Sequence, residues 1–294
     1  MEFIMKKILI TGANSYIGCS FEAYVREHYA QELKIDTVDM IDGTWREKDF
    51  SGYDAVFHVA GLAHADVGNV SEEVKQKYYA VNTDLTIETA KKAKAEGVKQ
   101  FVFMSSMIVY GGMEHITKDM EPQPANFYGD SKWQADKGVR ELQSDEFCVT
   151  VLRPPMIYGK GSKGNYPLLA KLAKKLPVFP RVNNKRSMLY IENLCEFLCL
   201  IMKEPQAGVF FPQNSELVNT SDMVKQISVA SGQKIWVTSL LTPFVAIGMK
   251  MPGKIGGLCR KAFGSSYYEP QMSECGLNYR VYGFEDTIRL TEAE

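Results

Sequence analysis

The sequence predicts an α/β protein built on a doubly wound parallel sheet, with a smaller carboxyl-terminal α/β region. Two observations predict this fold class. In the first half, short β-branched runs alternate with amphipathic stretches, the pattern of βαβ units that feed a parallel sheet. After Leu152 the alternation lapses, and loop-like stretches rich in Gly, Pro and Lys begin. We therefore expect a sheet domain over residues 1–155 and a second region over residues 156–294, packed together as one body.

β-branched runs and helical spacing assign the elements in order. Strands are predicted at Lys7 to Thr11, Ile35 to Asp39, Ala55 to Val59, Gln100 to Ser105 and Cys148 to Leu152. The helices between them are predicted at Tyr16 to Tyr29, Val70 to Glu96 and Phe127 to Leu142. The second region is predicted to hold helices at Pro167 to Lys175, Ile191 to Lys203 and Ser221 to Ser231, and loops at Gly159 to Tyr166 and Pro177 to Arg186.

Composition and charge fit a globular protein without a nucleic-acid partner. Of the 294 residues, 45% are hydrophobic and 23% are charged. The 34 Lys and Arg residues nearly balance the 35 Asp and Glu residues, which leaves a net charge of −1. Because this charge provides no overall basic field, we do not expect the chain to bind a phosphate backbone.

Cysteine usage and hydropathy predict a cytoplasmic protein with free thiols. The six cysteines are scattered, and the amino terminus lacks a signal-peptide layout, so we expect neither disulfides nor a metal site. The longest uncharged run, Ile235 to Met249, has 15 residues and contains Pro243. Since a span of the bilayer needs roughly 20 apolar residues, we expect no membrane span. We expect this run to form core or a lid rather than a membrane contact.

A glycine-rich turn joins the first strand to the first helix. A phosphate bound there needs a tight turn, close backbone approach and a helix amino terminus whose N–H groups face the anion. Gly12 can provide the turn and Gly18 can let the helix pack close to the strand, whereas Ser15 replaces the usual middle glycine. The residues predicted to bind a dinucleotide here are Gly12, Asn14, Ser15, Tyr16, Ile17 and Gly18.

Asp39 adds an acidic residue at the end of the second predicted strand, 27 residues beyond Gly12. A carboxylate at this point can accept hydrogen bonds from the adenosine ribose hydroxyls and would repel a 2′-phosphate. No Arg lies beside it, because Met40, Ile41 and Asp42 follow. The pattern therefore favours NAD, although NADP use stays compatible with it.

Several motifs in order resemble the extended short-chain dehydrogenase/reductase family, particularly its nucleotide-sugar epimerases and 4-keto-sugar reductases. The motifs are TGANSYIG, FHVAG at Phe57 to Gly61, FVFMSSMIVYG at Phe101 to Gly111, YGDSK at Tyr128 to Lys132, LRPPMIYG at Leu152 to Gly159 and RSMLYIENL at Arg186 to Leu194. The resemblance implies a Rossmann domain that binds NAD and a nucleotide-sugar substrate, UDP-linked, for the synthesis of cell-surface polysaccharide precursors. It also implies a homodimer through the helices predicted at Val70 to Glu96 and Phe127 to Leu142.

Tyr128 and Lys132 form the predicted catalytic pair, because residues four apart share one helix face. A phenol ionises near pH 10, so we expect the Lys ammonium and a positive nicotinamide to lower the pKa of Tyr128 toward the working range. The resemblance makes Ser106, rather than Ser105, the hydroxyl that holds the reacting oxygen. It places Lys132 at the nicotinamide ribose, and it implies further cofactor contacts at Ala60, Gly61, Asn82 and Pro155.

The residues after Ser106 restrict the reaction. Related dehydratases carry an Asp-Glu pair there, and 3,5-epimerising reductases carry a Cys two residues after the Ser. This chain has Met107 and Ile108, which cannot transfer protons, so hydride chemistry at one carbon remains. The resemblance places that carbon at C4, and two reactions stay open: 4-epimerisation, and 4-reduction of a 4-keto-6-deoxy-hexosamine. A non-catalytic NAD(P)-sensing protein on the same fold is the third alternative.

The substrate diphosphate suits a planar guanidinium that donates two hydrogen bonds. Arg186 is the first candidate by resemblance, and Asn165 and Lys185 are candidates for further polar contacts.

Overall fold

The computed structural model describes residues 5–63 and 70–293, and its centre is a six-stranded sheet in which every pairing is parallel. The strand order is β10-β6-β4-β3-β1-β2. The strands are β1 (Lys6–Thr11), β2 (Leu33–Val38), β3 (Ala55–His58), β4 (Gln100–Met104), β6 (Cys148–Leu152) and β10 (Gly208–Phe210). This arrangement confirms the doubly wound parallel sheet, and the order reverses direction at β1.

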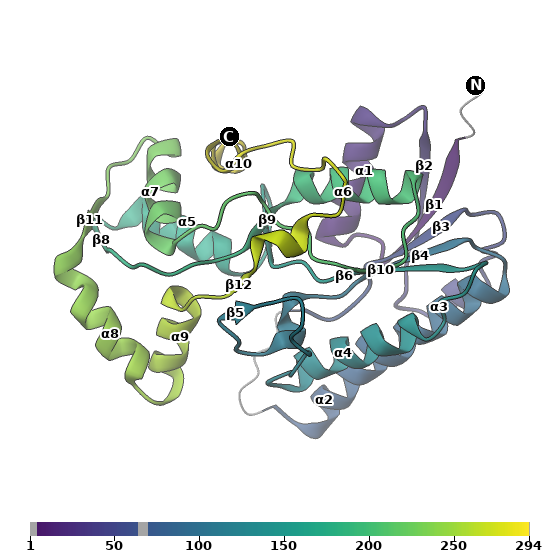
Figure 1. Ribbon diagram of the computed structural model, residues 1–294, viewed down its shortest axis with the longest axis horizontal. Helices are drawn as coiled ribbons and strands as arrows, with labels where there is room; N and C mark the ends of the chain where they lie inside the picture. Colours follow the sequence, from purple (N-terminus) through teal and green to yellow (C-terminus); the bar gives the residue numbers. More distant parts are fainter. Residues whose placement is uncertain (1–4, 64–69, 294) are drawn as a thin grey trace.

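Helices cover both faces of the sheet (Figure 1). On one face lie α1 (Tyr16–His28) and α6 (Ile191–Lys203), and on the other lie α2 (Glu72–Tyr79), α3 (Leu85–Ala95) and α4 (Phe127–Arg140). Because side chains alternate along a strand, Ile8 and Ile10 enter the core under α1 and α6, while Leu9 enters the core on the other face. Apolar burial on both faces therefore drives the sheet and its helix layers together.

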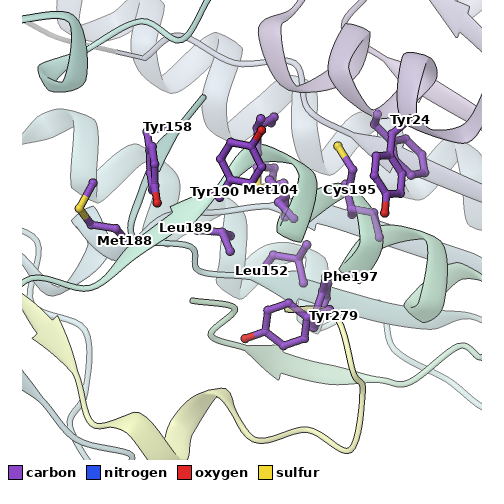
Figure 2. Packing of buried hydrophobic residues seen from close by; sticks show 14 of the residues in the cluster. Tyr24, Met104, Leu152, Tyr158, Met188, Leu189, Tyr190, Cys195, Phe197 and Tyr279 are labelled. Atoms are coloured by element: carbon purple, nitrogen blue, oxygen red, sulfur yellow. The ribbon is translucent and has the colours of Figure 1, made fainter. Parts of the chain in front are cut away.

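α6 holds the carboxyl-terminal half against the sheet. Figure 2 shows Cys195 of α6 pointing toward Tyr24 of α1, while Phe197 lies beside Tyr279. The Phe197 and Tyr279 rings meet edge to face, with 5.1 Å between their centroids. Both α6 and β10 come from beyond residue 155, so the second half of the chain completes the sheet and its cover. The division at residue 155 stays a prediction.

The helix predicted from Val70 to Glu96 is interrupted by a π turn over Ala80–Asp84, between α2 and α3. Such turns widen a helix locally and are frequent at functional sites. Here the turn contains Asn82, one of the predicted cofactor residues. The turn gives no signal in the hydrophobic period, and for this reason the sequence indicates a single helix.

The second region forms helices and two-stranded sheets at the end of the molecule away from β2 (Figure 1). Its helices are α5 (Asn165–Lys175), α7 (Thr220–Ala230), α8 (Thr242–Lys250), α9 (Gly253–Phe263) and α10 (Phe284–Glu292). The short strands of the two-stranded sheets are β5 (His115–Ile116), β7 (Met156–Tyr158), β8 (Val178–Pro180), β9 (Met188–Tyr190), β11 (Trp236–Thr238) and β12 (Tyr267–Tyr268). Along the whole chain, one-turn 3₁₀ helices span Thr44–Arg46, Met107–Tyr110, Ser239–Leu241 and Pro270–Ser273.

The uncharged run from Ile235 to Met249 was expected to form core or a lid, and the first of these alternatives is wrong. None of its large apolar side chains is fully buried, and Leu240 and Phe244 are more than two-thirds exposed. The physical reason is that α8 packs mainly against α9, so only one of its faces is covered. Within residues 5–63 and 70–293, no helix is long and apolar enough to cross a bilayer.

Candidate active site

The glycine-rich turn lies at the carboxyl edge of β1, where the sheet order reverses. Gly12 has a φ of 109°, and a Cβ there would lie 2.8 Å from the Ala60 backbone nitrogen, so only glycine fits. Asn14 also has a positive φ, which Asn tolerates better than most residues. Two turns of backbone, one after β1 and one after β3, therefore pack against each other at this edge.

Ser15 has a role that the sequence pattern does not predict. Its side chain accepts a hydrogen bond from the Gly18 N–H at 3.1 Å and so caps α1. A Cβ on Gly18 would lie 2.7 Å from that same Ser15 oxygen, so the small residue protects the cap. Of the other predicted contacts, Ile17 is half-buried in the core, and the buried Tyr16 hydroxyl has no partner among the described residues.

Asp39 lies in the exposed segment directly after β2, as predicted from its spacing. Its carboxylate accepts a hydrogen bond from the Ile41 N–H at 2.7 Å, which turns the chain away from the sheet edge. The second carboxylate oxygen is free to accept hydrogen bonds from ribose hydroxyls. The geometry fits the role that the sequence assigns to this residue.

Lys132, Asn82 and Gly61 converge beside the glycine-rich turn. Lys132 is buried, and its Nζ donates to the carbonyl oxygen of Met104 at the end of β4, at 3.1 Å. A Cβ on Gly61 would lie 3.0 Å from Lys132 Nζ and 3.0 Å from Asn82 Oδ1. Asn82 in turn accepts from the Leu62 N–H and donates to the Leu62 carbonyl. This bonding fixes the amide and holds the loop after β3 against α4.

Ser106 and Tyr128 lie on two elements that contact each other. Ser106 precedes the 3₁₀ turn at Met107–Tyr110 and caps it by accepting from the Ile108 N–H at 3.2 Å. Tyr128 lies in the first turn of α4, where a Cβ on the next residue, Gly129, would come within 2.9 Å of the Ile108 carbonyl oxygen. Glycine therefore lets α4 approach the turn that carries Ser106.

Ser105 points elsewhere, into a buried ionic cluster behind the site. Its hydroxyl donates to Asp136 at 3.1 Å, and Arg153 donates to both oxygens of the same carboxylate at 2.8 and 2.9 Å. Arg153 also donates to the Tyr110 hydroxyl at 2.7 Å. The cluster therefore joins α4, the residue after β6 and the 3₁₀ turn after Ser106. Pro155, two residues beyond Arg153, is also buried.

The expected direction of the Tyr128 pKa is wrong for the protein alone. Burial, and secondly the neighbouring Tyr78, raises the pKa of Tyr128 to about 12. The Lys132 ammonium donates to the Met104 carbonyl and lies over the Phe103 ring at 5.1 Å, and it is not among the causes of the shift. Burial lowers the pKa of Lys132 itself to about 8. At neutral pH Tyr128 is therefore a neutral phenol, whereas Lys132 is still largely a cation.

A pocket of about 760 Å³ lies on the substrate side of this site, between α5, α8, α9 and the chain after Tyr110. Of the predicted substrate residues, Asn165 and Arg186 line it. Ser266, another lining residue, donates to the Met107 sulfur at 3.4 Å, which connects the pocket to the residue after Ser106. Ser106, Tyr128 and Lys132 do not line it, so the pocket adjoins the predicted catalytic residues rather than enclosing them.

Arg186 is well suited to an anion. Its guanidinium donates to the carbonyl oxygens of Lys261 and Gly264 at the end of α9, and no carboxylate pairs with it within the described ranges. Burial lowers its pKa, which is the cost of a charge without a counterion. Asn165 lies in the first turn of α5, whose dipole also favours negative charge. Lys185 is exposed, lies 5.5 Å over the Tyr267 ring and does not line the pocket.

Sequence reasoning missed the contribution of the α8–α9 hairpin. Its inner face supplies the pocket with two cations, Arg260 and Lys261, and with apolar side chains from Val245, Met249 and Phe263. The spacing of these residues on two short amphipathic helices could have indicated this contribution, but the uncharged run from Ile235 to Met249 obscured the pattern.

The residues fit a dinucleotide and show no metal centre. The close approach at Gly12, the capped amino terminus of α1 and the exposed carboxylate of Asp39 provide what a bound NAD requires. Among the described residues, no group of three or more His, Cys, Asp or Glu side chains is placed to hold a metal ion.

Comparison with known proteins gives a family match over most of the chain. Residues 8–211 match the NAD dependent epimerase/dehydratase family. A UDP-glucose 4-epimerase of Vibrio cholerae is 30% identical over 256 residues, 79% of this chain and 77% of the relative. An N-acetyl-alpha-D-glucosaminyl-diphospho-ditrans,octacis-undecaprenol 4-epimerase of Escherichia coli O157:H7 is 31% identical over 272 residues, 86% of this chain and 78% of the relative.

A solved structure gives the same result for the fold. The UDP-N-acetylglucosamine 4-epimerase from Bacillus cereus superposes with a TM-score of 0.73 at 16% identity, over 98% of each chain. At this identity the likeness concerns the fold alone.

Proposed function

The chain belongs to the NAD-dependent epimerase/dehydratase family, and on that premise we propose that it is a 4-epimerase that transfers hydride at C4 of a diphosphate-linked hexose. The observation that carries this proposal is the approach of α4 to the turn after β4, which brings the segment around Tyr128 to the segment around Ser106. NAD is the proposed cofactor, because Asp39 is exposed after β2 without an adjacent basic residue.

Three side chains perform the proposed chemistry. Ser106 holds the hydroxyl oxygen at C4 and orients it. Tyr128 takes the proton from that oxygen and later returns it. Lys132 holds the cofactor ribose and, with a pKa near 8, is still largely a cation at neutral pH. When bound, NAD would supply hydride exchange at the sugar carbon and a positive charge that favours the Tyr128 phenolate.

The substrate would place its sugar toward Ser106 and its diphosphate in the pocket. Arg186, Arg260 and Lys261 are the cations that line this pocket, and Asn165 adds an amide at the amino terminus of α5. A guanidinium without a carboxylate partner matches a diphosphate by bidentate hydrogen bonds. Lys185 remains a weaker candidate, because it lies outside the pocket lining.

The group beyond the diphosphate has two candidates. Uridine is the first, in agreement with the UDP-sugar relative. A polyprenol is the second, because the other relative is named for an undecaprenol-linked sugar and because Val245, Met249 and Phe263 give the pocket an apolar wall. Either substrate would belong to the synthesis of cell-surface polysaccharide precursors, which we propose to occur in the cytoplasm.

Two other readings of the site remain as alternatives. A 4-keto-sugar reductase would use the same three residues but would consume reduced cofactor stoichiometrically. An NAD(P)-sensing protein would not need the convergence of Ser106, Tyr128 and Lys132. We further propose a homodimer through α2, α3 and α4.

Incubation of the protein with candidate sugars, followed by analysis of the products by NMR, tests the proposal. Purified protein with NAD receives UDP-glucose, UDP-N-acetylglucosamine or the 4-keto-6-deoxy derivative of the latter. We expect a C4 epimer to form without net change in absorbance at 340 nm. Loss of NADH only with the keto-sugar would replace the epimerase proposal with the reductase, and bound NAD without turnover of any sugar would favour the sensor.

A further inference from the structure

The α8–α9 hairpin exposes a continuous row of large apolar side chains. Leu240, Phe244, Ile247 and Met251 follow one another at intervals of four, three and four residues. Phe244 and Ile247 share one face of α8, while Leu240 lies in the 3₁₀ turn before it and Met251 caps its end. Leu240 is 73% exposed, Phe244 70% and Ile247 62%. Trp236, four residues before Leu240, and Leu258 on α9 are also exposed, at 62% and 63%. Monomeric soluble proteins rarely expose contiguous apolar patches of this kind without a binding partner.

The side of α8 that faces α9 is buried. Gly248 of α8 packs against Cys259 of α9 so closely that a Cβ would lie 2.8 Å from the sulfur. Arg260 donates to the carbonyl oxygens of Met249 and Met251 and fixes the connection between the helices. These contacts fix α8 against α9, so the outer row lies on a well-defined surface. Figure 1 shows the hairpin at one end of the molecule, away from the central sheet.

Two stretches of this region carry positive charge only. Residues 223–268 contain six Lys and Arg residues and no Asp or Glu, and residues 160–191 contain eight Lys and Arg residues and no Asp or Glu. The whole chain nevertheless has a net charge of −1. Lys234 and Lys250 are exposed, and no acidic side chain pairs with them in the part of the chain that the structure describes.

We propose that the outer face of the α8–α9 hairpin docks on an anionic lipid bilayer. Apolar side chains accompanied by unpaired Lys are the chemistry of an interfacial helix, which inserts its apolar face at the headgroup level and attracts acidic lipids. Trp236 at the border of the row matches the preference of Trp for that level. A second copy of the chain is a poorer occupant, because two such faces would bring like charges together.

Docking would place the pocket next to the bilayer. Val245, Met249 and Arg260 line the pocket from the hairpin whose other face would contact lipid. A sugar diphosphate carried on a polyprenol could then reach the pocket without leaving the membrane. This consequence rests on the proposed function, whereas the docking surface does not.

Vesicle sedimentation with the full chain and NAD tests the docking. We expect binding to vesicles that contain phosphatidylglycerol, weaker binding at high salt, and little binding to phosphatidylcholine alone. The double variant Phe244→Gln, Ile247→Gln should lower the ratio of bound to free protein by about tenfold or more. The matched control is Val229→Gln on α7, because Val229 is 63% exposed and lies outside the row. The control should bind within about twofold of wild type.

Charge and folding are tested separately. Lys250→Gln should weaken binding to acidic vesicles, whereas Lys91→Gln on α3 should not. All variants should keep the wild-type melting temperature and bind NAD. Wild-type protein that stays in the supernatant with acidic vesicles would overturn the docking. Retention of binding by the double variant would do the same, and so would a dimer that this variant converts to monomers.

The two proposals fail in different ways. Tyr128→Phe should bind vesicles like wild type and lose turnover. Vesicle binding without turnover of any sugar would overturn the proposed function and leave the docking intact. Turnover of UDP-sugars without vesicle binding would overturn the docking alone.

Discussion

The carboxyl edge of the sheet and the α8–α9 hairpin handle polar and apolar groups in opposite ways. At the sheet edge, Lys132, Asn82 and Asp136 are buried, and each has hydrogen-bond partners of its own. On the hairpin, Phe244 and Ile247 face outward. The first region buries polar groups within the protein, and the second leaves apolar groups uncovered.

The difference indicates a separate role for each region. A buried polar group is costly unless its geometry is fixed, so the sheet edge is a preorganised region suited to chemistry. An exposed apolar row gains free energy only when something covers it, so the hairpin is suited to binding. The pocket between them, with Arg186 and Arg260 in its lining, joins the two regions.

The largest effect should come from Tyr128→Phe. Loss of the phenol hydroxyl removes the proposed acid/base, so turnover should fall by about 10²–10⁴-fold, while NAD binding persists. Initial rates and NAD titration measure both. Tyr78→Phe is the control, because the Tyr78 ring meets Tyr128 edge to face at 5.8 Å and keeps its shape in the variant. Full activity of Tyr128→Phe would show that the sheet edge is not where proton transfer occurs.

The second effect concerns stability and sharpens the contrast between buried and exposed charge. Asp136→Ala leaves the Arg153 guanidinium buried without its carboxylate, so the free energy of unfolding should fall by about 3–5 kcal/mol. Asp286→Ala removes a carboxylate from an exposed pair with Arg289 at 2.8 Å and should cost less than about 1 kcal/mol. Denaturant unfolding of both variants measures the difference. Equal losses of stability would mean that burial does not determine how much these ion pairs contribute to the free energy of unfolding.

Sequence reasoning succeeded where local chemistry determines the structure. The strand Cys148–Leu152 and the helix Ile191–Lys203 occur with the predicted bounds, because a hydrophobic period specifies each directly. The turn at Gly12 was predictable because a close backbone approach requires glycine. The placement of Tyr128 and Lys132 on one helix followed from their spacing.

It failed where contacts between distant segments decide the outcome. The Tyr128 pKa depends on its burial and on Tyr78, fifty residues away in sequence, and neither appears in a local motif. The run Ile235 to Met249 is hydrophobic enough for a core, but residues 5–63 and 70–293 supply no cover for its exposed side chains. The π turn around Asn82 is set by its fit against α4 rather than by helix propensity.

The third effect tests the pocket between the two regions. Arg186→Ala should raise the KM for a diphosphate-linked sugar by about 10–100-fold with a smaller change in kcat, because a charge-assisted hydrogen bond is lost. Lys185→Ala removes the neighbouring cation, which does not line the pocket, and should change KM by less than about threefold. Steady-state kinetics on both variants distinguishes them. The reverse order would move the diphosphate out of the pocket and toward Tyr267.

The smallest effect is a pH dependence at the sheet edge. His58 is fully buried between Thr11 and Thr86, and burial, with the Lys132 charge second, lowers its pKa to about 3. The unfolded chain takes up a proton near pH 6.5 and the folded chain does not, so stability falls as the pH drops from 6.5 toward 3. Between pH 7.5 and 5 the loss should be about 2 kcal/mol. The same unfolding series on His58→Gln should lack this part of the loss, because the variant has no imidazole at this position. A variant that loses as much stability as wild type would show that His58 is accessible to protons, and the sheet edge would then be less rigidly buried than its hydrogen bonds indicate.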